Sequence, residues 1–177
     1  MLGLSIVGCY ALLNATHVLP TLVQLAAPAS AARIGYAVGD ALPEIPGVLF
    51  QRSALTILAV IKSDCRYCTN SMPLYRSLID PLNRNGDVSF VALCLEPEDS
   101  CRRYLEQHRV QTDAVVSVDS ALLRIAGTPT LIGADRTGRV RDAWTGAQPP
   151  AGEDAIRRMV REQGNERLTV VKRRCTR

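Results

Sequence analysis

The order of the expected elements predicts an α/β sandwich with a mixed sheet. An apolar run of strand length, Leu55 to Lys62, suits a strand that is buried on both faces of a sheet, and Val88 to Leu95 is a second run of strand length. A helix-patterned stretch follows each run, and two shorter strand-like runs flank a turn near the carboxyl end. Strands alternating with helices, followed by a hairpin and a last helix, predict this fold class.

The first half of the chain is expected to hold an extended lead-in, one buried strand and one helix. The lead-in covers Arg33 to Pro46, which contains two glycines and two prolines, and a short edge strand follows at Val48 to Phe50. After the buried strand, a helix is expected over Arg66 to Asn83, because apolar residues recur there at helical spacings. Pro73 lies inside this helix and is expected to kink it, since proline lacks an N–H and crowds the preceding turn.

The second half is expected to add shorter elements around the hairpin. Glu98 and Asp99 place negative charge at a helix start, which favours a helix from Glu98 to Arg109. Asp135 to Gly138 has the composition of a tight turn and joins the hairpin strands. The remaining expected elements are a strand at Val115 to Val118, a helical turn at Ser120 to Ala126, hairpin strands at Thr130 to Ala134 and Val140 to Trp144, and a closing helix at Gly152 to Gln163.

Composition and charge fit one globular domain with a sizeable core. The chain has 177 residues, of which 47% are hydrophobic and 21% are charged. The net charge of +4 is mildly basic and gives no reason by itself to expect a nucleic-acid partner. No internal repeat is visible, so we expect a single domain over residues 33–165, followed by a basic tail over residues 166–177.

The first 32 residues contain no Lys, Arg, Asp or Glu and are rich in aliphatic side chains. Small residues from Ala27 to Ala32 fit the preference of signal peptidase, with cleavage after Ala29 or Ala31. We therefore expect a signal peptide or N-terminal membrane anchor at residues 1–32 and an extracytoplasmic location, with membrane association in the anchored case. Polar residues interrupt the apolar run, which makes a continuous membrane span the weaker interpretation, and a buried N-terminal helix of a cytosolic protein is the alternative to export.

A pair of cysteines, Cys65 and Cys68, lies where the first buried strand is expected to give way to the helix. Two thiols at this spacing can close a small disulfide that a reductant opens again. Cys65 is near the helix N-terminus, where unpaired backbone N–H groups and the helix dipole favour the thiolate. It is therefore the candidate nucleophile, and Cys68 is the candidate resolving thiol. Arg66 adds positive charge beside Cys65, whereas Asp64 opposes it.

Other motifs accompany the cysteine pair. They are Gly39-Asp40-x-Leu-Pro43 in the lead-in, Pro73 in the helix, Gly127-Thr128-Pro129-Thr130 before a strand, and the turn from Asp135 to Gly138. Together with Cys65 and Cys68, this set resembles the thioredoxin-like superfamily, and within it the TlpA/redoxin type of extracytoplasmic thiol–disulfide oxidoreductase. The resemblance covers residues 35–163. It implies a thioredoxin-like three-layer α/β sandwich with a mixed central sheet flanked by helices.

The resemblance also implies where a client protein would bind. Thr128-Pro129 would form a cis peptide bond facing the cysteines, and the neighbouring backbone would pair with an extended client segment. Arg66, Tyr67, Thr128 and Pro129 are the expected client-binding residues. The implied partners are a client protein with a disulfide or dithiol and an upstream redox partner protein. Neither a metal nor an organic cofactor is implied.

Two positions depart from the family's pattern. Many members carry Trp just before the first cysteine, where this chain has Asp64. Members also often bury an acidic residue that relays the proton of the second cysteine, in the strand before the motif or just after it. Those places hold Ala59 and Ser71 here, so we expect no carboxylate relay. A water, Lys62 or Asp64 is the candidate substitute, and the rate of resolution depends on which of them serves.

The cysteines leave several alternatives open. Cys94 and Cys101 are expected to form a structural disulfide or to stay separate core thiols, and a second redox pair that passes electrons to Cys65 and Cys68 is the alternative. All four have the ligand count of a zinc site, but the glycine-containing knuckles of such sites are absent. Cys65 and Cys68 would, in the plainest interpretation, form a structural disulfide or remain inert thiols.

The sequence as a whole favours a specialised protein-disulfide reductase. A disulfide oxidase or isomerase is the close alternative, because the motif does not set the reduction potential. A peroxidase of the peroxiredoxin class fits worse, since Ser63-Asp64 is not the Thr/Pro loop that precedes a peroxidatic cysteine. From another class, a non-catalytic binding or assembly module is favoured by the missing proton relay and opposed by the retained cysteine pair and Pro129.

Overall fold

The structure is a computed structural model that describes residues 34–79 and 87–164, with side chains up to residue 162. The expected leader at residues 1–32 and the basic tail at 166–177 lie outside the described residues, as does the last part of the expected helix from Arg66 to Asn83. Within the described ranges, no helix is both long enough and apolar enough to cross a membrane.

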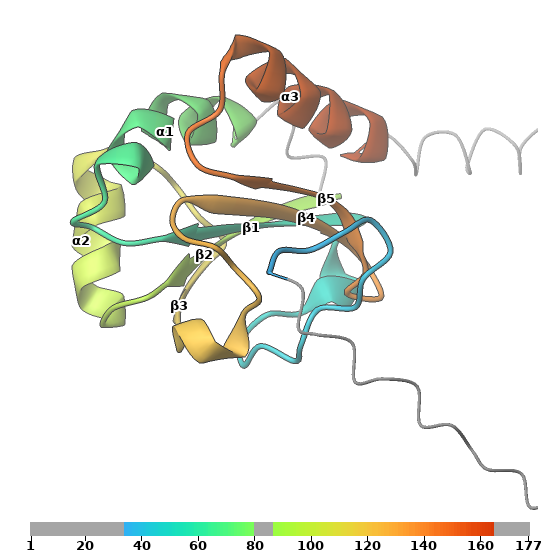
Figure 1. The fold of residues 1–177 in the computed structure, drawn as a ribbon, viewed down its shortest axis with the longest axis horizontal. Helices are drawn as coiled ribbons and strands as arrows, with labels where there is room; N and C mark the ends of the chain where they lie inside the picture. The colour runs from blue at the N-terminus through green and yellow to red at the C-terminus, as the bar shows by residue number, and fades with distance from the viewer. Residues whose placement is uncertain (1–33, 80–86, 165–177) are drawn as a thin grey trace, which may run out of the picture. The chain divides into compact units, whose positions relative to one another are not determined.

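Within the described residues, the core is a mixed five-stranded sheet in the order β3-β2-β1-β4-β5 (Figure 1). A mixed sheet was expected from the sequence, whereas the order of its strands was not predicted. The strands are β1 (Leu55–Ile61), β2 (Val88–Cys94), β3 (Ala114–Ser117), β4 (Thr130–Asp135) and β5 (Val140–Thr145). Strand β1 is parallel to β2 and antiparallel to β4, so Ala59 faces Ala92 on one side and Leu131 on the other. Its central position explains why all seven of its residues are buried and why all of them except Thr56 are apolar.

Three α-helices cover one face of the sheet. They are α1 (Arg66–Leu78), α2 (Glu98–Gln107) and α3 (Pro150–Gly164), and Figure 1 shows α1 and α3 on the same side of the strands. The side chains of Leu55, Ile57 and Ile61 pack with residues of all three helices in one buried cluster. Each such fully buried aliphatic side chain stabilises the fold by about 1.5–3 kcal/mol. The positions that face the core are therefore occupied by apolar residues, and this spacing predicted the strands and helices from the sequence.

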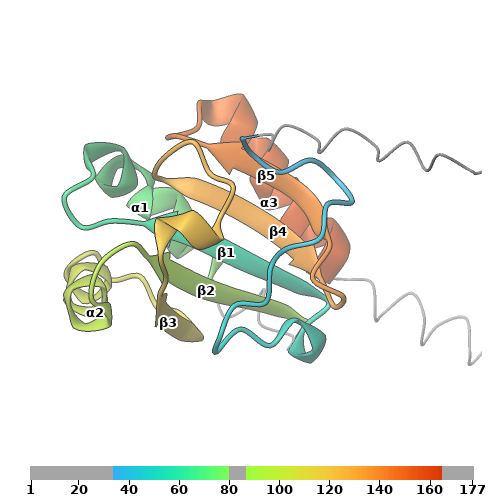
Figure 2. The ribbon, with the colours of Figure 1, turned by 60° about the horizontal axis from the view of Figure 1, so that its bottom comes forward.

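The opposite face of the sheet carries no α-helix within the described residues. Leu58 and Val60 point to this face and pack beneath the lead-in and the segment after β3. Two 3-10 turns belong to this cover, η1 (Phe50–Arg52) and η3 (Ser120–Leu122). Figure 2 shows the lead-in and η3 in front of the sheet and α3 behind it. This face therefore depends on irregular backbone for its packing.

Two expected elements differ from the structure on this face. The edge strand expected at Val48 to Phe50 is wrong, because the N–H of Val48 bonds to the carbonyl of Ile45 and Phe50 opens η1. The edge of β5 is met instead by the lead-in, through a bridge between Ala41 and Arg139. The helical turn expected up to Ala126 stops at Leu122, since the next residue is already extended.

Candidate active site

The nucleophile candidate sits where β1 leads into α1. Strand β1 ends at Ile61, a short loop follows, and Cys65 is the N-cap residue of α1. Its Sγ accepts a hydrogen bond from the backbone N–H of Cys68 at 3.2 Å, in the place where a Ser or Thr oxygen commonly caps a helix. A sulfur in this position faces unpaired N–H groups and the positive end of the helix dipole, both of which favour the thiolate.

The two thiols of the motif are unequal. Both are free cysteines, Cys65 partly exposed and Cys68 fully buried. Burial raises the pKa of Cys68 to about 12, with a further contribution from its hydrogen bond to Cys65. Partial burial also raises the pKa of Cys65, but hydrogen bonds with Cys68 and with the side chain of Thr128 outweigh it and leave that pKa below its usual value. Cys65 is thus the accessible and more acidic thiol.

The segment before β4 lies against Cys65. The Thr128–Pro129 peptide bond is cis, and the Sγ–H of Cys65 donates to the carbonyl oxygen of Thr128 at 3.3 Å. The carbonyl of Pro129 accepts the N–H of Gly146 at 2.7 Å, and the hydroxyl of Thr130 donates to Gly127 at 2.7 Å. The fold therefore brings Thr128 and Pro129 to the cysteines across the sheet from a position 63 residues away.

Arg66 and Tyr67, the other expected client-binding residues, occupy the first turn of α1. Both side chains are exposed, and that of Tyr67 is 58% exposed although it is aromatic. An exposed aromatic ring beside a partly exposed sulfur offers apolar contact area to an approaching chain. Asp64 is also exposed and pairs with Lys62 at 2.8 Å, so the charge that opposes the Cys65 thiolate has a cationic neighbour.

Glu96 is a site residue that the sequence analysis missed. Its carboxylate accepts the backbone N–H of Ser63 at 2.7 Å and the hydroxyl of Ser63 at 2.8 Å, so it holds the loop that precedes Cys65. The expected acid positions, Ala59 and Ser71, are buried and carry no carboxylate. The available signal was an acid just past the end of β2, because the carboxyl ends of adjacent parallel strands meet at one edge of the sheet.

A pocket adjoins this loop at the carboxyl ends of β1, β2 and β3. Its volume is about 670 Å³. The lining residues are Lys62, Leu95, Glu96, Pro97, Ser117, Val118, Asp119 and Ser120. The pocket combines charged, hydroxyl and apolar groups within reach of the loop that carries Cys65, which is the composition of a surface that a peptide segment can contact.

The second cysteine pair is a disulfide between Cys94, at the end of β2, and Cys101, in α2. Both residues are fully buried, and the bond spans a sequence separation of 7 that includes Glu96. Two of the four sulfurs of the hypothetical zinc site are therefore bonded to each other. Among the residues that the structure describes, no group of three or more His, Cys, Asp or Glu side chains is placed to hold a metal ion.

Comparison with known proteins gives a match through structure only. No protein-family model and no curated protein matches the sequence. A protein from Chlorobium tepidum that is assigned as the thiol:disulfide interchange protein DsbE superposes with a TM-score of 0.61 at 21% identity, over 73% of this chain and 99% of its own. The thioredoxin domain of a thiol-disulfide oxidoreductase from Bacteroides vulgatus gives 0.59 at 14% identity, over 71% and 99%.

The protein has the thioredoxin-like fold. The resemblance drawn from the cysteine and proline motifs is thus confirmed at the level of the fold. A second Chlorobium tepidum protein, described as a thiol:disulfide interchange protein of the thioredoxin family, superposes with a TM-score of 0.56 at 17% identity over 73% of this chain and 99% of its own. The thioredoxin-like fold places the two sulfurs and the Thr128–Pro129 segment together at one end of the sheet.

Proposed function

We propose that this protein is a thiol–disulfide oxidoreductase that exchanges disulfides with a client protein through Cys65 and Cys68. The observation that carries the proposal is the inequality of the two thiols beside the Thr128–Pro129 segment. Cys65 is partly exposed and its pKa is lowered, whereas Cys68 is buried and its pKa is raised to about 12. An accessible thiolate beside a sheltered partner is what sequential disulfide exchange requires.

In the proposed reaction, the Cys65 thiolate attacks one sulfur of the client disulfide. A bond forms between Cys65 Sγ and that sulfur, the client disulfide breaks, and the other client sulfur leaves as a thiolate. Cys68 then loses its proton and attacks Cys65 Sγ, which forms the Cys65–Cys68 disulfide and releases the second client thiolate. Two electrons pass to the client, whose two thiolates take up the one proton that Cys68 releases and a second proton from water. No other carrier of electrons takes part in this exchange.

Client recognition is assigned to the residues around Cys65, of which Arg66 and Tyr67 are exposed, Thr128 is partly exposed and Pro129 is buried. We assign the contacts to Arg66 and Tyr67 at the start of α1 and to Thr128 and Pro129 opposite them. Tyr67 supports this assignment by its exposure, and Thr128 by its contact with the nucleophilic sulfur. An extended client segment could add backbone hydrogen bonds beside Pro129, as in strand addition.

We further propose that the protein works outside the cytoplasm as a specialised reductase. Residues 1–32 would serve as a signal peptide or membrane anchor for the domain at 33–165, with residues 166–177 as a basic tail. The Cys94–Cys101 disulfide supports an oxidising compartment, where such bonds persist. An upstream redox protein would return two electrons to the Cys65–Cys68 disulfide after each turnover, because the compartment itself would leave it oxidised.

A redox titration of the full chain in mild detergent tests this proposal. The protein is equilibrated in graded thiol/disulfide buffers, and mass tagging of free cysteines reports each pair separately. A reversible Cys65–Cys68 couple near or below about −250 mV supports the reductase, whereas one near about −120 mV indicates an oxidase. A pair that never cycles overturns the enzyme, and client binding that survives Cys65→Ser then identifies a binding module.

A further inference from the structure

Arg124 joins the lead-in to the segment before β4 through both its backbone and its side chain. Its carbonyl accepts the N–H of Gly35 at 2.7 Å, and its N–H donates to the hydroxyl of Tyr36 at 3.2 Å. The guanidinium lies 4.6 Å from the centre of the Tyr36 ring and donates to Asp40 Oδ2 at 3.0 Å. The same oxygen accepts the N–H of Ala37, which fixes the carboxylate. We call Tyr36, Asp40 and Arg124 the clasp.

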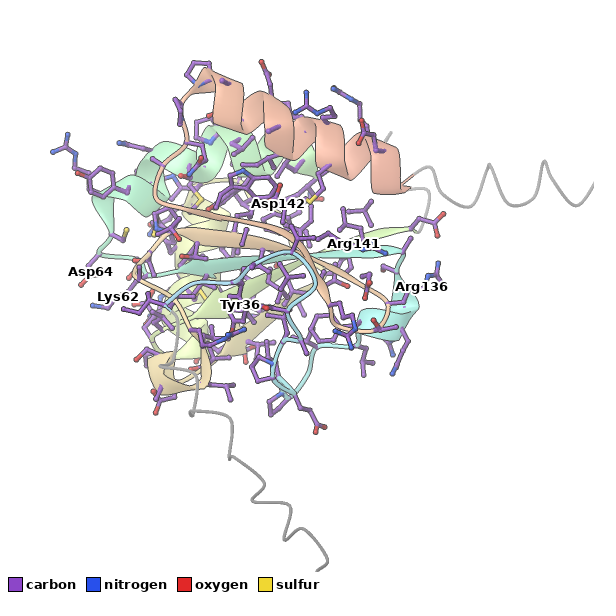
Figure 3. All side chains as sticks on the ribbon, turned by 45° about the vertical axis from the view of Figure 1, so that its right-hand side comes forward. Tyr36, Lys62, Asp64, Arg136, Arg141 and Asp142 are labelled. Carbon is purple, nitrogen blue, oxygen red and sulfur yellow. A yellow bond between two sulfur atoms is a disulfide. The ribbon has the colours of Figure 1, made fainter. Side chains whose placement is uncertain are left out.

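One half of the clasp is fixed to the sheet. The N–H of Gly39 donates to the carbonyl of Val140 at 2.7 Å, and the N–H of Val140 donates to Asp40 at 2.8 Å. The N–H of Leu42 donates to Gly138 at 2.9 Å just beyond. The lead-in therefore lies along β5 as a short extra edge, and Tyr36, labelled in Figure 3, comes from a segment that the sheet itself holds in place.

The other half of the clasp leads directly to the candidate nucleophile. Four residues after Arg124 comes Thr128, whose carbonyl oxygen is 3.3 Å from Cys65 Sγ. The intervening chain has little freedom, because Leu123 and Ile125 pack into the core of this face and the carbonyl of Gly127 is held by Thr130. A displacement of Arg124 would therefore move Thr128 relative to the sulfur rather than be absorbed by a loose loop.

The clasp holds the backbone on the face of the sheet that no described α-helix covers. Within the described residues, this face of the sheet is covered by the lead-in, the two 3-10 turns and the segment after β3, so no α-helix backs the segment that carries Thr128. The pairing between Arg124 and Asp40 bridges 84 residues of sequence and supplies a fixed point where a helix would otherwise pack. Arginine suits this task, since one planar group can stack on Tyr36 and pair with Asp40 at once.

We propose that Arg124 is a positioning residue for the Cys65 site, which it serves by tying the Thr128–Pro129 segment to the lead-in. This inference rests on the proposed function, because it names the part of the fold that sets the geometry of that same site. The lead-in, which directly follows the expected leader, thereby becomes part of the machinery that orients Thr128. Loss of the clasp loosens Thr128 and slows exchange at Cys65 without removing any group that reacts.

The test is the pH dependence of alkylation at Cys65 in the full-length Arg124→Ala variant. Burial raises the pKa of Cys65, and hydrogen bonds with Cys68 and Thr128 lower it. The Thr128 carbonyl accepts the Cys65 S–H and so favours the thiol, whereas the Thr128 side chain lowers the pKa of Cys65. With Thr128 displaced both contributions change, so we expect the midpoint of iodoacetamide reaction at Cys65, followed by peptide mass mapping, to shift from its wild-type value. Reduction of the insulin disulfide in a single turnover should slow about three- to tenfold, as expected for a misplaced reacting group.

Two further variants separate positioning from general destabilisation. Arg141→Ala removes an ion pair of similar exposure, Arg141 with Asp135 at 3.3 Å, from the opposite end of the molecule to Lys62 and Asp64 (Figure 3). It should leave the Cys65 midpoint and the exchange rate unchanged. Arg124→Lys keeps the charge but loses the planar group, so both readouts should fall between those of the wild type and Arg124→Ala.

The outcomes keep this inference apart from the proposed function. Unchanged alkylation and exchange in Arg124→Ala, with or without a lower melting temperature, would overturn the positioning role. Equal effects in Arg124→Ala and Arg141→Ala would do the same, because the change would then be a general one. If the wild type never cycles, the enzyme proposal fails, but the alkylation midpoints still decide whether Arg124 positions Thr128.

Discussion

The two cysteine pairs of this chain lie in opposite surroundings. Cys65 and Cys68 are free thiols at the start of α1, and the first of them is partly exposed and capped by backbone N–H. Cys94 and Cys101 form a disulfide between β2 and α2, and neither is exposed. The first pair can be approached by another sulfur, whereas the second is closed to attack unless the structure opens.

This difference shows that location assigns the role of a cysteine. At a strand-to-helix junction, hydrogen bonds with Cys68 and with the Thr128 side chain lower the pKa of Cys65, and burial keeps Cys68 protonated. Within the core, the other pair staples one helix to the sheet and encloses the segment that carries Glu96. We therefore expect Cys65 and Cys68 to react and the Cys94–Cys101 disulfide to stabilise the structure around them.

Removal of the exposed sulfur should have the largest effect. Cys65→Ser is expected to abolish insulin-disulfide reduction, a loss of at least about a thousandfold, since no other accessible thiolate is available in the described site. Cys68→Ser should instead accumulate a mixed disulfide at Cys65 that non-reducing gels and mass spectrometry detect. Turnover that persists in Cys65→Ser would mean that the contrast between the pairs is wrong.

The pH dependence of alkylation should differ between Cys65 and Cys68, with an effect almost as large as that of Cys65→Ser. Because the pKa of Cys65 is lowered, its alkylation should begin at lower pH than that of free cysteine and should be lost as the pH falls through that value. Cys68, with a pKa raised to about 12 by burial, should be thiolate in only roughly one molecule in ten thousand at pH 8. Peptide mapping after brief alkylation measures both rates, and equal rates would contradict the assignment.

Loss of the buried disulfide should lower stability and leave the reactive pair working. Cys94→Ala with Cys101→Ala releases a constraint over a sequence separation of 7, which is expected to reduce the free energy of unfolding by about 2–3 kcal/mol. Denaturant unfolding measures this change, with Cys65→Ala and Cys68→Ala as the matched control that removes two sulfurs without removing a cross-link. A double variant that unfolds as the wild type does would show that the staple contributes nothing.

Local patterns were enough to predict the layers of the fold. The runs at β1 and β2 are mostly apolar because both faces of these strands are largely covered, and the pattern of α1 reflects one buried side against the sheet. The edge strand expected at Val48 to Phe50 was wrong because apolar residues are buried in turns as well as in strands. Val48 and Phe50 pack beneath the sheet from a turn, whereas Leu49 is exposed, and burial alone does not distinguish a strand from a loop that folds over the sheet.

The candidate site was predictable only in part, because its outer members are set by long-range register. Cys65, Cys68 and the Thr128–Pro129 segment were found from motifs, and the structure brings them together. Glu96 reaches Ser63 across 33 residues, and Arg124 reaches Asp40 across 84. No local periodicity encodes such contacts. They depend on which strands are neighbours in the sheet. The sequence predicted the order of elements along the chain but not the order of strands across the sheet.

The carboxylate of Glu96 should give the smallest of the expected effects, since it acts on the reactive pair only through Ser63. Glu96→Gln keeps the shape but leaves one of the two Ser63 donors without its charged acceptor, which is expected to cost about 1–2 kcal/mol of stability. Exchange at Cys65 should slow only about two- to fivefold, because the loop keeps its hydrogen bond from Cys65 N–H to Lys62.

Ser63→Ala provides the matched test of Glu96, because it removes the hydroxyl and retains the backbone N–H that the carboxylate also accepts. If Glu96 acts by holding the loop, Ser63→Ala should reproduce part of the Glu96→Gln effect, and the double variant should lose less than the sum of the two. Strict additivity in the insulin assay would show that Glu96 acts on the cysteines by another route. The Cys94–Cys101 disulfide, whose loop contains Glu96, would then not be linked to the reactive pair through Ser63.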